Sequence, residues 1–131
     1  MKTKDQLNLP TDCHYTKEHI WIKADADNFL VGISDYAQDQ LGEIAFIELP
    51  EVGTHFEANA QFGTVESVKS VNSLYMPLAG TIAAVNNELE DTPTLSNASC
   101  YGDGWILRVT LDNPKDVDTL LDAAAYAATL E

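Results

Sequence analysis

The sequence contains very few basic residues. Only 7 of its 131 residues are Lys or Arg, against 21 Asp or Glu, and the formal net charge is −14. Binding of nucleic acid or of an anionic membrane depends on clustered Lys and Arg, so the composition argues against both kinds of partner. It favours protein partners with basic docking patches, or a surface whose charge serves solubility alone.

Cysteines and long apolar runs are also scarce. The two cysteines, Cys13 and Cys100, form no CxxC pair, so we expect two free thiols, with a disulfide between them as the open alternative. No stretch approaches the ~18 apolar residues of a membrane span. No apolar run follows the polar N-terminus, so no signal peptide is expected. Together these features predict a cytoplasmic protein.

Short strands dominate the remaining pattern. Apolar and polar residues alternate in short runs, and turn residues interrupt them every ~8–12 residues, which is typical of a small sandwich or barrel-like fold. The length predicts a single domain, 1–131. Because the strands precede the helices, a parallel α/β sheet is not expected. The expected strands are 19–23, 29–33, 43–49, 62–68, 71–75, 81–85 and 105–111.

Helices are expected in two places. Ser34 is a candidate N-cap for a short helix that ends at Gly42 in the left-handed conformation. Apolar residues at helical spacing predict a C-terminal helical segment over 113–131. Residues 1–12 are expected to form a loose N-terminal leader, and residues 87–103 an irregular excursion.

Lys69 is the most informative residue. It is the only Lys or Arg between Lys23 and Arg108, an interval that holds 13 Asp and Glu residues. Alternation on both sides of it predicts strand, tight turn and strand, with Lys69 at the tip. An amine held at one exposed point suits the attachment of a prosthetic group, whereas an ordinary solvated turn lysine is the alternative.

The residues around Lys69 suggest how such a hairpin works. Val65, Val68 and Val71 are expected to anchor its strands in the core. Glu66, three residues before Lys69, is a candidate recognition handle for the modifying enzyme.

Other catalytic or metal-binding patterns do not stand out. His14, His19 and His55 have no metal-ligand spacing, and the sequence contains neither a G-x-S-x-G motif nor a phosphate-binding glycine loop. We therefore expect no catalytic residues and no metal site.

The segment GTVESVKS (63–70), followed by YMPLAGTI (75–82), resembles the lipoyl-lysine hairpin of glycine cleavage system H proteins. Shorter matches run in the same order along the chain, including 31–34, 41–43 and 101–105. The resemblance implies a mainly β fold, a lipoyl-domain-like barrel-sandwich hybrid of two small antiparallel sheets with short helices and a C-terminal helical segment. It also implies that lipoate is attached to Lys69 through an amide bond.

The resemblance further implies a carrier rather than an enzyme. In the family, the lipoyl arm shuttles the aminomethyl group of glycine from the PLP-dependent glycine decarboxylase (P protein) to the tetrahydrofolate-dependent aminomethyltransferase (T protein). Dihydrolipoamide dehydrogenase (L protein) reoxidises the arm. A lipoate ligase or a lipoyl/octanoyl transferase is implied as the modifying enzyme.

Two alternatives remain at this point. Another swinging-arm module, a biotin carrier or a lipoyl domain of a 2-oxoacid dehydrogenase, would also present a lysine on a hairpin. Biotin carriers typically flank that lysine with Met, whereas Val68 and Ser70 stand here. The other alternative is an unmodified acidic interaction protein.

The chain departs from the family at three positions. Cys100 stands where relatives usually have Pro before Tyr101, and we expect this to be a neutral loop change. Ile20 and Ser73 stand where relatives often have carboxylates that help to hold the loaded arm. We expect weaker holding of the arm here, unless Glu18 substitutes for them.

Overall fold

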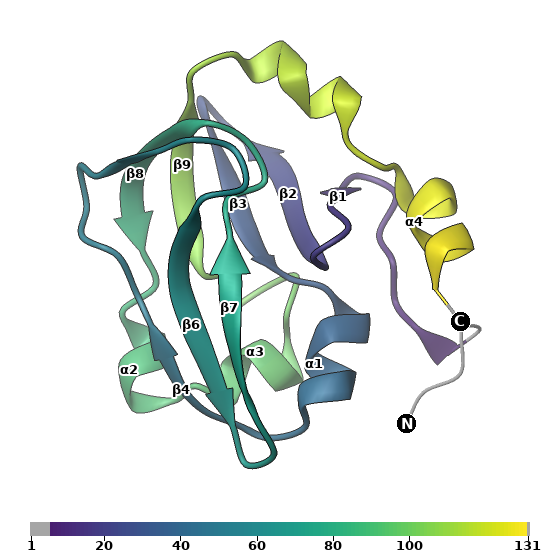
Figure 1. The fold of residues 1–131 in the computed structure, drawn as a ribbon, viewed down its shortest axis with the longest axis vertical. Helices are drawn as coiled ribbons and strands as arrows, with labels where there is room; N and C mark the ends of the chain where they lie inside the picture. Colours follow the sequence, from purple (N-terminus) through teal and green to yellow (C-terminus); the bar gives the residue numbers. More distant parts are fainter. Residues whose placement is uncertain (1–5, 131) are drawn as a thin grey trace.

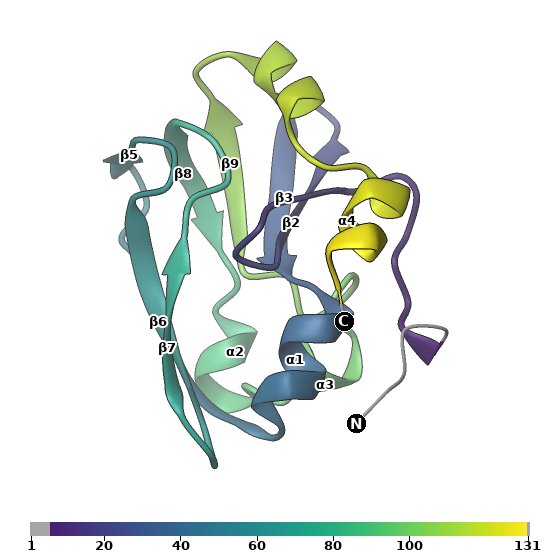
Figure 2. The same ribbon diagram turned by 45° about the vertical axis from the view of Figure 1, so that its right-hand side comes forward.

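The computed structural model describes residues 6–130 and contains two antiparallel β-sheets. Figures 1 and 2 show the two sheets facing each other, with short helices at one end and along one side. The prediction of a mainly β fold with two small antiparallel sheets is confirmed. The six-stranded sheet has the order β1 (His14–Tyr15), β2 (Ile20–Asp25), β3 (Asn28–Ile33), β9 (Leu107–Leu111), β8 (Gly80–Val85) and β5 (His55–Phe56). The three-stranded sheet has the order β4 (Ile44–Glu48), β6 (Gln61–Ser67) and β7 (Val71–Tyr75).

The main hydrophobic core lies between the two sheets. Successive side chains of a strand point to opposite faces, so each strand gives alternate residues to this core. Full burial of each such aliphatic side chain contributes roughly 1.5–3 kcal/mol, which makes this layer the principal stabilising element. Its buried members include Ile22, Val31, Ile82 and Val109 from the larger sheet, and Ile47, Val65 and Leu74 from the smaller one.

A second, aromatic cluster covers the outer face of β2. Trp21 points away from the main core and packs there with Tyr15 and Tyr126, and all three side chains are fully buried. The indole ring lies directly on Gly32, where an added Cβ would come within 2.7 Å of the ring nitrogen. That nitrogen donates a hydrogen bond to the carbonyl oxygen of Cys100 at 2.9 Å.

The helices are short. Helix α1 (Asp35–Leu41) begins at Ser34, whose hydroxyl accepts from the amide of Ala37, and ends at Gly42, whose φ is +74°. Both expected ends of this helix are therefore confirmed. The stretch 87–103, expected to be irregular, contains α2 (Glu88–Asp91) and α3 (Leu95–Ala98). The C-terminal part contains a 3₁₀ helix, η2 (Pro114–Thr119), and α4 (Ala123–Thr129).

None of the helices within residues 6–130 is long and apolar enough to cross a membrane. Cys13 and Cys100 form no disulfide with each other, which agrees with the expectation of two thiols, and both are buried. Burial raises the pKa of the Cys13 thiol to about 12, which keeps it protonated and unreactive.

The expectation of a loose leader applies to residues 1–12, of which 1–5 lie outside the described part of the chain. The rest of that segment is attached to the fold. The amide of Asn8 donates to a carboxylate oxygen of Asp35 at 2.8 Å, and the hydroxyl of Tyr15 donates to the carbonyl of Pro10 at 2.7 Å. Leu7 and Leu9 pack against the aromatic cluster, because it offers them an apolar surface on which to be buried.

Gly63 lies where β6 comes very close to the backbone of β4. An added Cβ at Gly63 would collide with the backbone carbonyl of Glu48 on β4, which has no room to move within the sheet. We expect Gly63→Ala to lower the free energy of unfolding by about 1–3 kcal/mol in urea denaturation. Gly102→Ala is the comparison, because the atom that an added Cβ would meet there is the side-chain oxygen of Ser99, which can move, and not backbone. Equal losses in both variants would contradict a steric origin at Gly63.

Candidate functional site

Lys69 lies at the apex of the β6–β7 hairpin. Figure 1 shows this hairpin extending beyond the rest of the smaller sheet, beside α1. β6 ends at Ser67 and β7 begins at Val71, so the predicted strand, turn and strand are confirmed. The amide of Ser67 donates to the carbonyl of Ser70 at 2.8 Å, which closes a tight turn around Val68 and Lys69.

A side chain and a neighbouring loop hold this turn. Two-residue hairpin turns commonly use positive φ angles, but neither Val68 nor Lys69 has one. Instead, the hydroxyl oxygen of Ser67 accepts from the amides of Lys69 at 3.2 Å and Ser70 at 3.1 Å. The amide of Val68 donates to the carbonyl of Glu43 at 3.0 Å. The amine is thus carried on a fixed backbone, although its side chain is exposed.

The side chain of Lys69 lies over the end of α1. An added Cβ at Gly42 would come within 3.0 Å of Lys69 Cε and 3.7 Å of Nζ. Asn97, on α3, fixes this floor: its amide nitrogen donates to the carbonyl of Gly42 at 2.8 Å, and its amide oxygen accepts from the amide of Ile44 at 2.9 Å. Sequence reasoning missed Asn97, because one Asn in a polar stretch carries no signal of a contact about fifty residues away.

The three valines of the hairpin do not behave alike. Val65 is buried in the main core, with 1% of its surface exposed. Val68 and Val71 are 68% and 64% exposed, so the expectation that they anchor the strands is wrong. Glu66 is exposed, as expected of a recognition handle.

A cleft of about 370 Å³ lies between α1 and β7. Its lining includes Leu41, the chain neighbour of the Gly42 that Lys69 approaches. Its floor is apolar, and its rim carries polar groups from the segment before β2 and from β7. An apolar cleft with a few polar groups is the usual form of a small-molecule site. Its apolar members include Ile33, Leu41, Val65 and Leu74, and its rim includes Glu18, His19 and Ser73.

His19 on the rim is held in an uncommon conformation. Its φ is +68°, a left-handed value that His adopts only occasionally. Its Nδ1 is hydrogen-bonded to the hydroxyl of Tyr126 at 2.7 Å, and its ring packs against Tyr36. Burial lowers the pKa of His19, so the ring is neutral near neutral pH. Glu18 is then the one charged group among the residues that line the cleft.

The two departures that concern the loaded arm, Ser73 and Ile20, lie in different surroundings. Ser73 borders the cleft from β7, an edge strand. Ile20 is only 1% exposed, and its side chain belongs to the main core. A carboxylate at position 20 of this chain would therefore be buried among aliphatic side chains.

Comparison with known proteins gives one consistent result. The sequence model of the family "Glycine cleavage H-protein" matches residues 13–131. The glycine cleavage system H protein of Symbiobacterium thermophilum is 53% identical over 121 residues, which cover 92% of this chain and 94% of that protein. That of Geobacillus thermodenitrificans is 47% identical over 122 residues, covering 93% and 96%. The crystal structure of a glycine cleavage system H protein from Mycobacterium marinum superimposes with a TM-score of 0.85 at 35% identity, covering 92% of this chain and 98% of that one.

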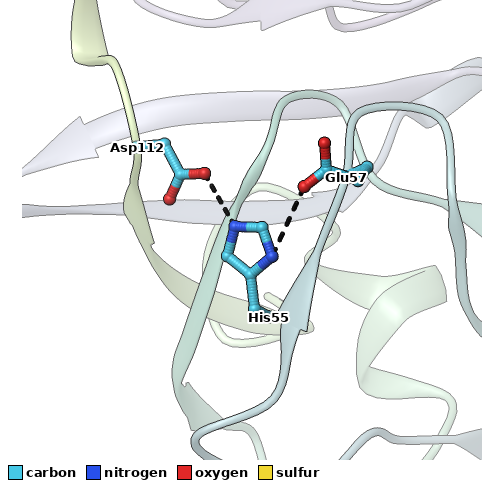
Figure 3. A network of polar contacts seen from close by, with 3 residues as sticks. All are labelled: His55, Glu57 and Asp112. Atoms are coloured by element: carbon cyan, nitrogen blue, oxygen red, sulfur yellow. Dashed lines mark hydrogen bonds and ion pairs between the residues drawn. The ribbon is translucent and has the colours of Figure 1, made fainter.

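A second polar cluster lies elsewhere, at the edge of the larger sheet (Figure 3). His55 Nε2 lies 2.7 Å from a carboxylate oxygen of Asp112, and His55 Nδ1 lies 3.5 Å from one of Glu57. The ligand atoms of the three side chains come within 4.8 Å of one another, a grouping that the sequence spacing did not indicate. Because the carboxylates contact different ring nitrogens, the arrangement suits a protonated imidazole that bridges two acids.

The His55 cluster makes stability depend on pH. The hydrogen bond to Asp112, with the charges of Asp112 and Glu57, raises the pKa of His55 above its usual ~6.5. A raised pKa in the folded state means that the contribution to stability is fully present below ~6.5 and is lost as pH rises through the folded value. We expect His55→Gln to flatten the dependence of the free energy of unfolding on pH over this window. His14→Gln is the control, and an unchanged profile in His55→Gln would contradict the assignment.

Proposed function

This chain belongs to the glycine cleavage H-protein family, and we propose that Lys69 is the attachment point of its lipoyl group. Members of this family are carrier proteins of the glycine cleavage system. The observation that carries the proposal is the placement of Lys69: a single amine in an acidic part of the chain, at the apex of a hairpin fixed by Ser67 and Glu43.

The residues around Lys69 fit such a group. A lipoyl arm is largely apolar, and the cleft between α1 and β7 has an apolar floor that could receive it. The Cε methylene of Lys69 already lies beside Gly42, at the end of the helix that forms one wall of the cleft. When bound, the group supplies a disulfide that accepts the aminomethyl fragment of glycine and is later regenerated by oxidation.

In the attachment reaction, the chain only needs to present the amine of Lys69, because the modifying enzyme supplies the activated acyl donor. Lys69 Nζ loses a proton and attacks the carbonyl carbon of an activated acyl donor, such as an acyl adenylate. The new N–C bond replaces the C–O bond of the donor, and AMP leaves with the electron pair. The amide is neutral, so the formal net charge changes from −14 to −15 (−14 − 1).

The rim of the cleft suits a cationic cargo. An aminomethyl amine is protonated near neutral pH, and a hydrogen bond from it to a carboxylate is charge-assisted. Neutral His19 offers no repulsion, and Glu18 supplies the negative charge. With Ile20 buried, we propose Glu18 as the group that holds the loaded arm, in place of the carboxylates that relatives often have.

The partners proposed are the glycine decarboxylase, the aminomethyltransferase, dihydrolipoamide dehydrogenase and a lipoate-attaching enzyme. A tethered arm reaches each of them at a high effective concentration without a large permanent interface. The net charge of −14 favours basic docking patches on these enzymes.

The attachment site is tested by mass. Protein co-expressed with a lipoate ligase should gain one lipoyl increment, and peptide mass spectrometry should place it on Lys69. Lys69→Arg keeps the charge but lacks a modifiable amine, so it should gain none. Modification of another lysine, or biotin in place of lipoate, would contradict the proposal.

Holding of the cargo is tested at the rim. With the lipoylated protein loaded from glycine by the decarboxylase, Glu18→Gln should release ammonia faster in the absence of the transferase. Ser73→Asp should release it more slowly, because it adds a second carboxylate beside the cleft. Glu51→Gln, an exposed change in the turn after β4, is the control. If both rim variants release ammonia at the rate of the parent protein, Glu18 and Ser73 do not help to hold the loaded arm.

A further inference from the structure

The outer face of the smaller sheet carries an exposed row beside the apex of the hairpin. In the strand register, Phe46 pairs with Glu66, and Glu66 pairs with Val71. Residues directly opposite each other on antiparallel strands project to the same face, so these three side chains are neighbours. We call Phe46, Glu66 and Val71 the tip row. All three are exposed, Phe46 by 47% and Val71 by 64%.

The tip row is unusual for this molecule. Four large hydrophobic side chains are markedly exposed within residues 6–130: Phe46, Val52, Val68 and Val71. Two of them belong to the tip row, and Val68 stands at the apex beside Lys69. The opposite face of the same strands is fully used by the main core. Apolar groups gathered on an exposed face are typical of a contact surface for another molecule.

We propose that the tip row is the docking surface for the enzyme that attaches the acyl group to Lys69. This inference rests on the proposed function of Lys69. The attaching enzyme meets the chain before any arm exists, so it must bring its active site to Nζ itself and cover the apex. Enzymes that act on the far end of a completed arm need not touch the hairpin backbone. The tip row starts one residue before the Ser67 turn and therefore lies within that covered area.

Charge and shape define the partner surface. Glu66 stands between two apolar side chains, and Glu48, two residues from Phe46 along β4, adds a second acid on the same face. The complementary surface is an apolar depression for Phe46 and Val71, with a cationic side chain aimed at Glu66. Interface energy of this kind is concentrated in a few residues, with aromatic side chains prominent among them.

A matched pair of valines gives the first test. Val71→Thr and Val52→Thr make the same change at positions of nearly equal exposure, 64% and 61%, and only position 71 belongs to the tip row. Threonine also suits a strand, so the fold is retained. With a lipoate–protein ligase, lipoate and ATP, we expect kcat/KM for modification of Lys69 to fall roughly tenfold in Val71→Thr. It should be unchanged in Val52→Thr, and thermal unfolding should verify that both variants are folded.

A second set of variants separates apolar from electrostatic contact. Phe46→Thr should lower kcat/KM at least as much as Val71→Thr, at every salt concentration. Glu66→Gln should also lower it, but the deficit should shrink as salt is raised, because added salt screens exposed charges. Glu51→Gln serves as the charge control, because it lies in the turn at the other end of β4.

The outcomes are distinguishable. If the parent protein is not modified on Lys69 at all, the proposed function fails. If the parent is modified and the tip-row variants are modified at the same rate, the docking inference is overturned while the function of Lys69 stands. Variants that accept lipoate normally but are loaded poorly by the glycine decarboxylase would assign the tip row to the decarboxylase, which also overturns the inference.

Discussion

The structure depends on burial of one face of the β6–β7 hairpin against the larger sheet. Val65 and Leu74 enter the main core, and this contact fixes which side chains of the two strands point outward. Glu66 and Val71 are exposed for the same reason that Val65 and Leu74 are buried, since successive residues alternate between faces. The apex, the cleft and the tip row therefore all depend on which face of the hairpin packs against the larger sheet. A slip of one residue in the strand register would move the buried side chains to the exposed face and the exposed ones to the core.

Local patterns predicted the parts of the fold that are encoded locally. The hairpin around Lys69, the cap at Ser34 and the end of α1 at Gly42 all follow from a few neighbouring residues. The error at Val68 and Val71 has a physical reason. Val68 lies in the turn beyond the end of β6, and Val71 pairs with the exposed Glu66, so neither projects to the face that buries Val65. Contacts between distant segments were not predictable: neither the Asn97 clamp nor the pairing of His55 with Asp112 has a sequence signature.

Two aromatic residues from opposite parts of the sequence, Tyr15 and Tyr126, support the rim of the cleft. Tyr126 on α4 stacks on Tyr15, and its hydroxyl is shared between His19 and Ser34. The C-terminal helix thus orients the rim residue His19 and the cap of α1 through one phenol. The small helices around the sheets hold particular side chains in place at the site, in addition to covering apolar surface.

Gly42 has a bearing on protein engineering. The hairpin and the helix end adjoin, because the amide of Val68 donates to the carbonyl of Glu43 and Lys69 Cε lies within 3.0 Å of where a β-carbon at position 42 would stand. Asn97 holds that helix end in place. A lysine hairpin grafted alone onto another scaffold would include the apex but would lose the contact of the lysine side chain with the end of α1. A transplant that keeps the resting position of the amine must include α1 through Gly42 and a donor in the place of Asn97, so the smallest portable module is discontinuous in sequence.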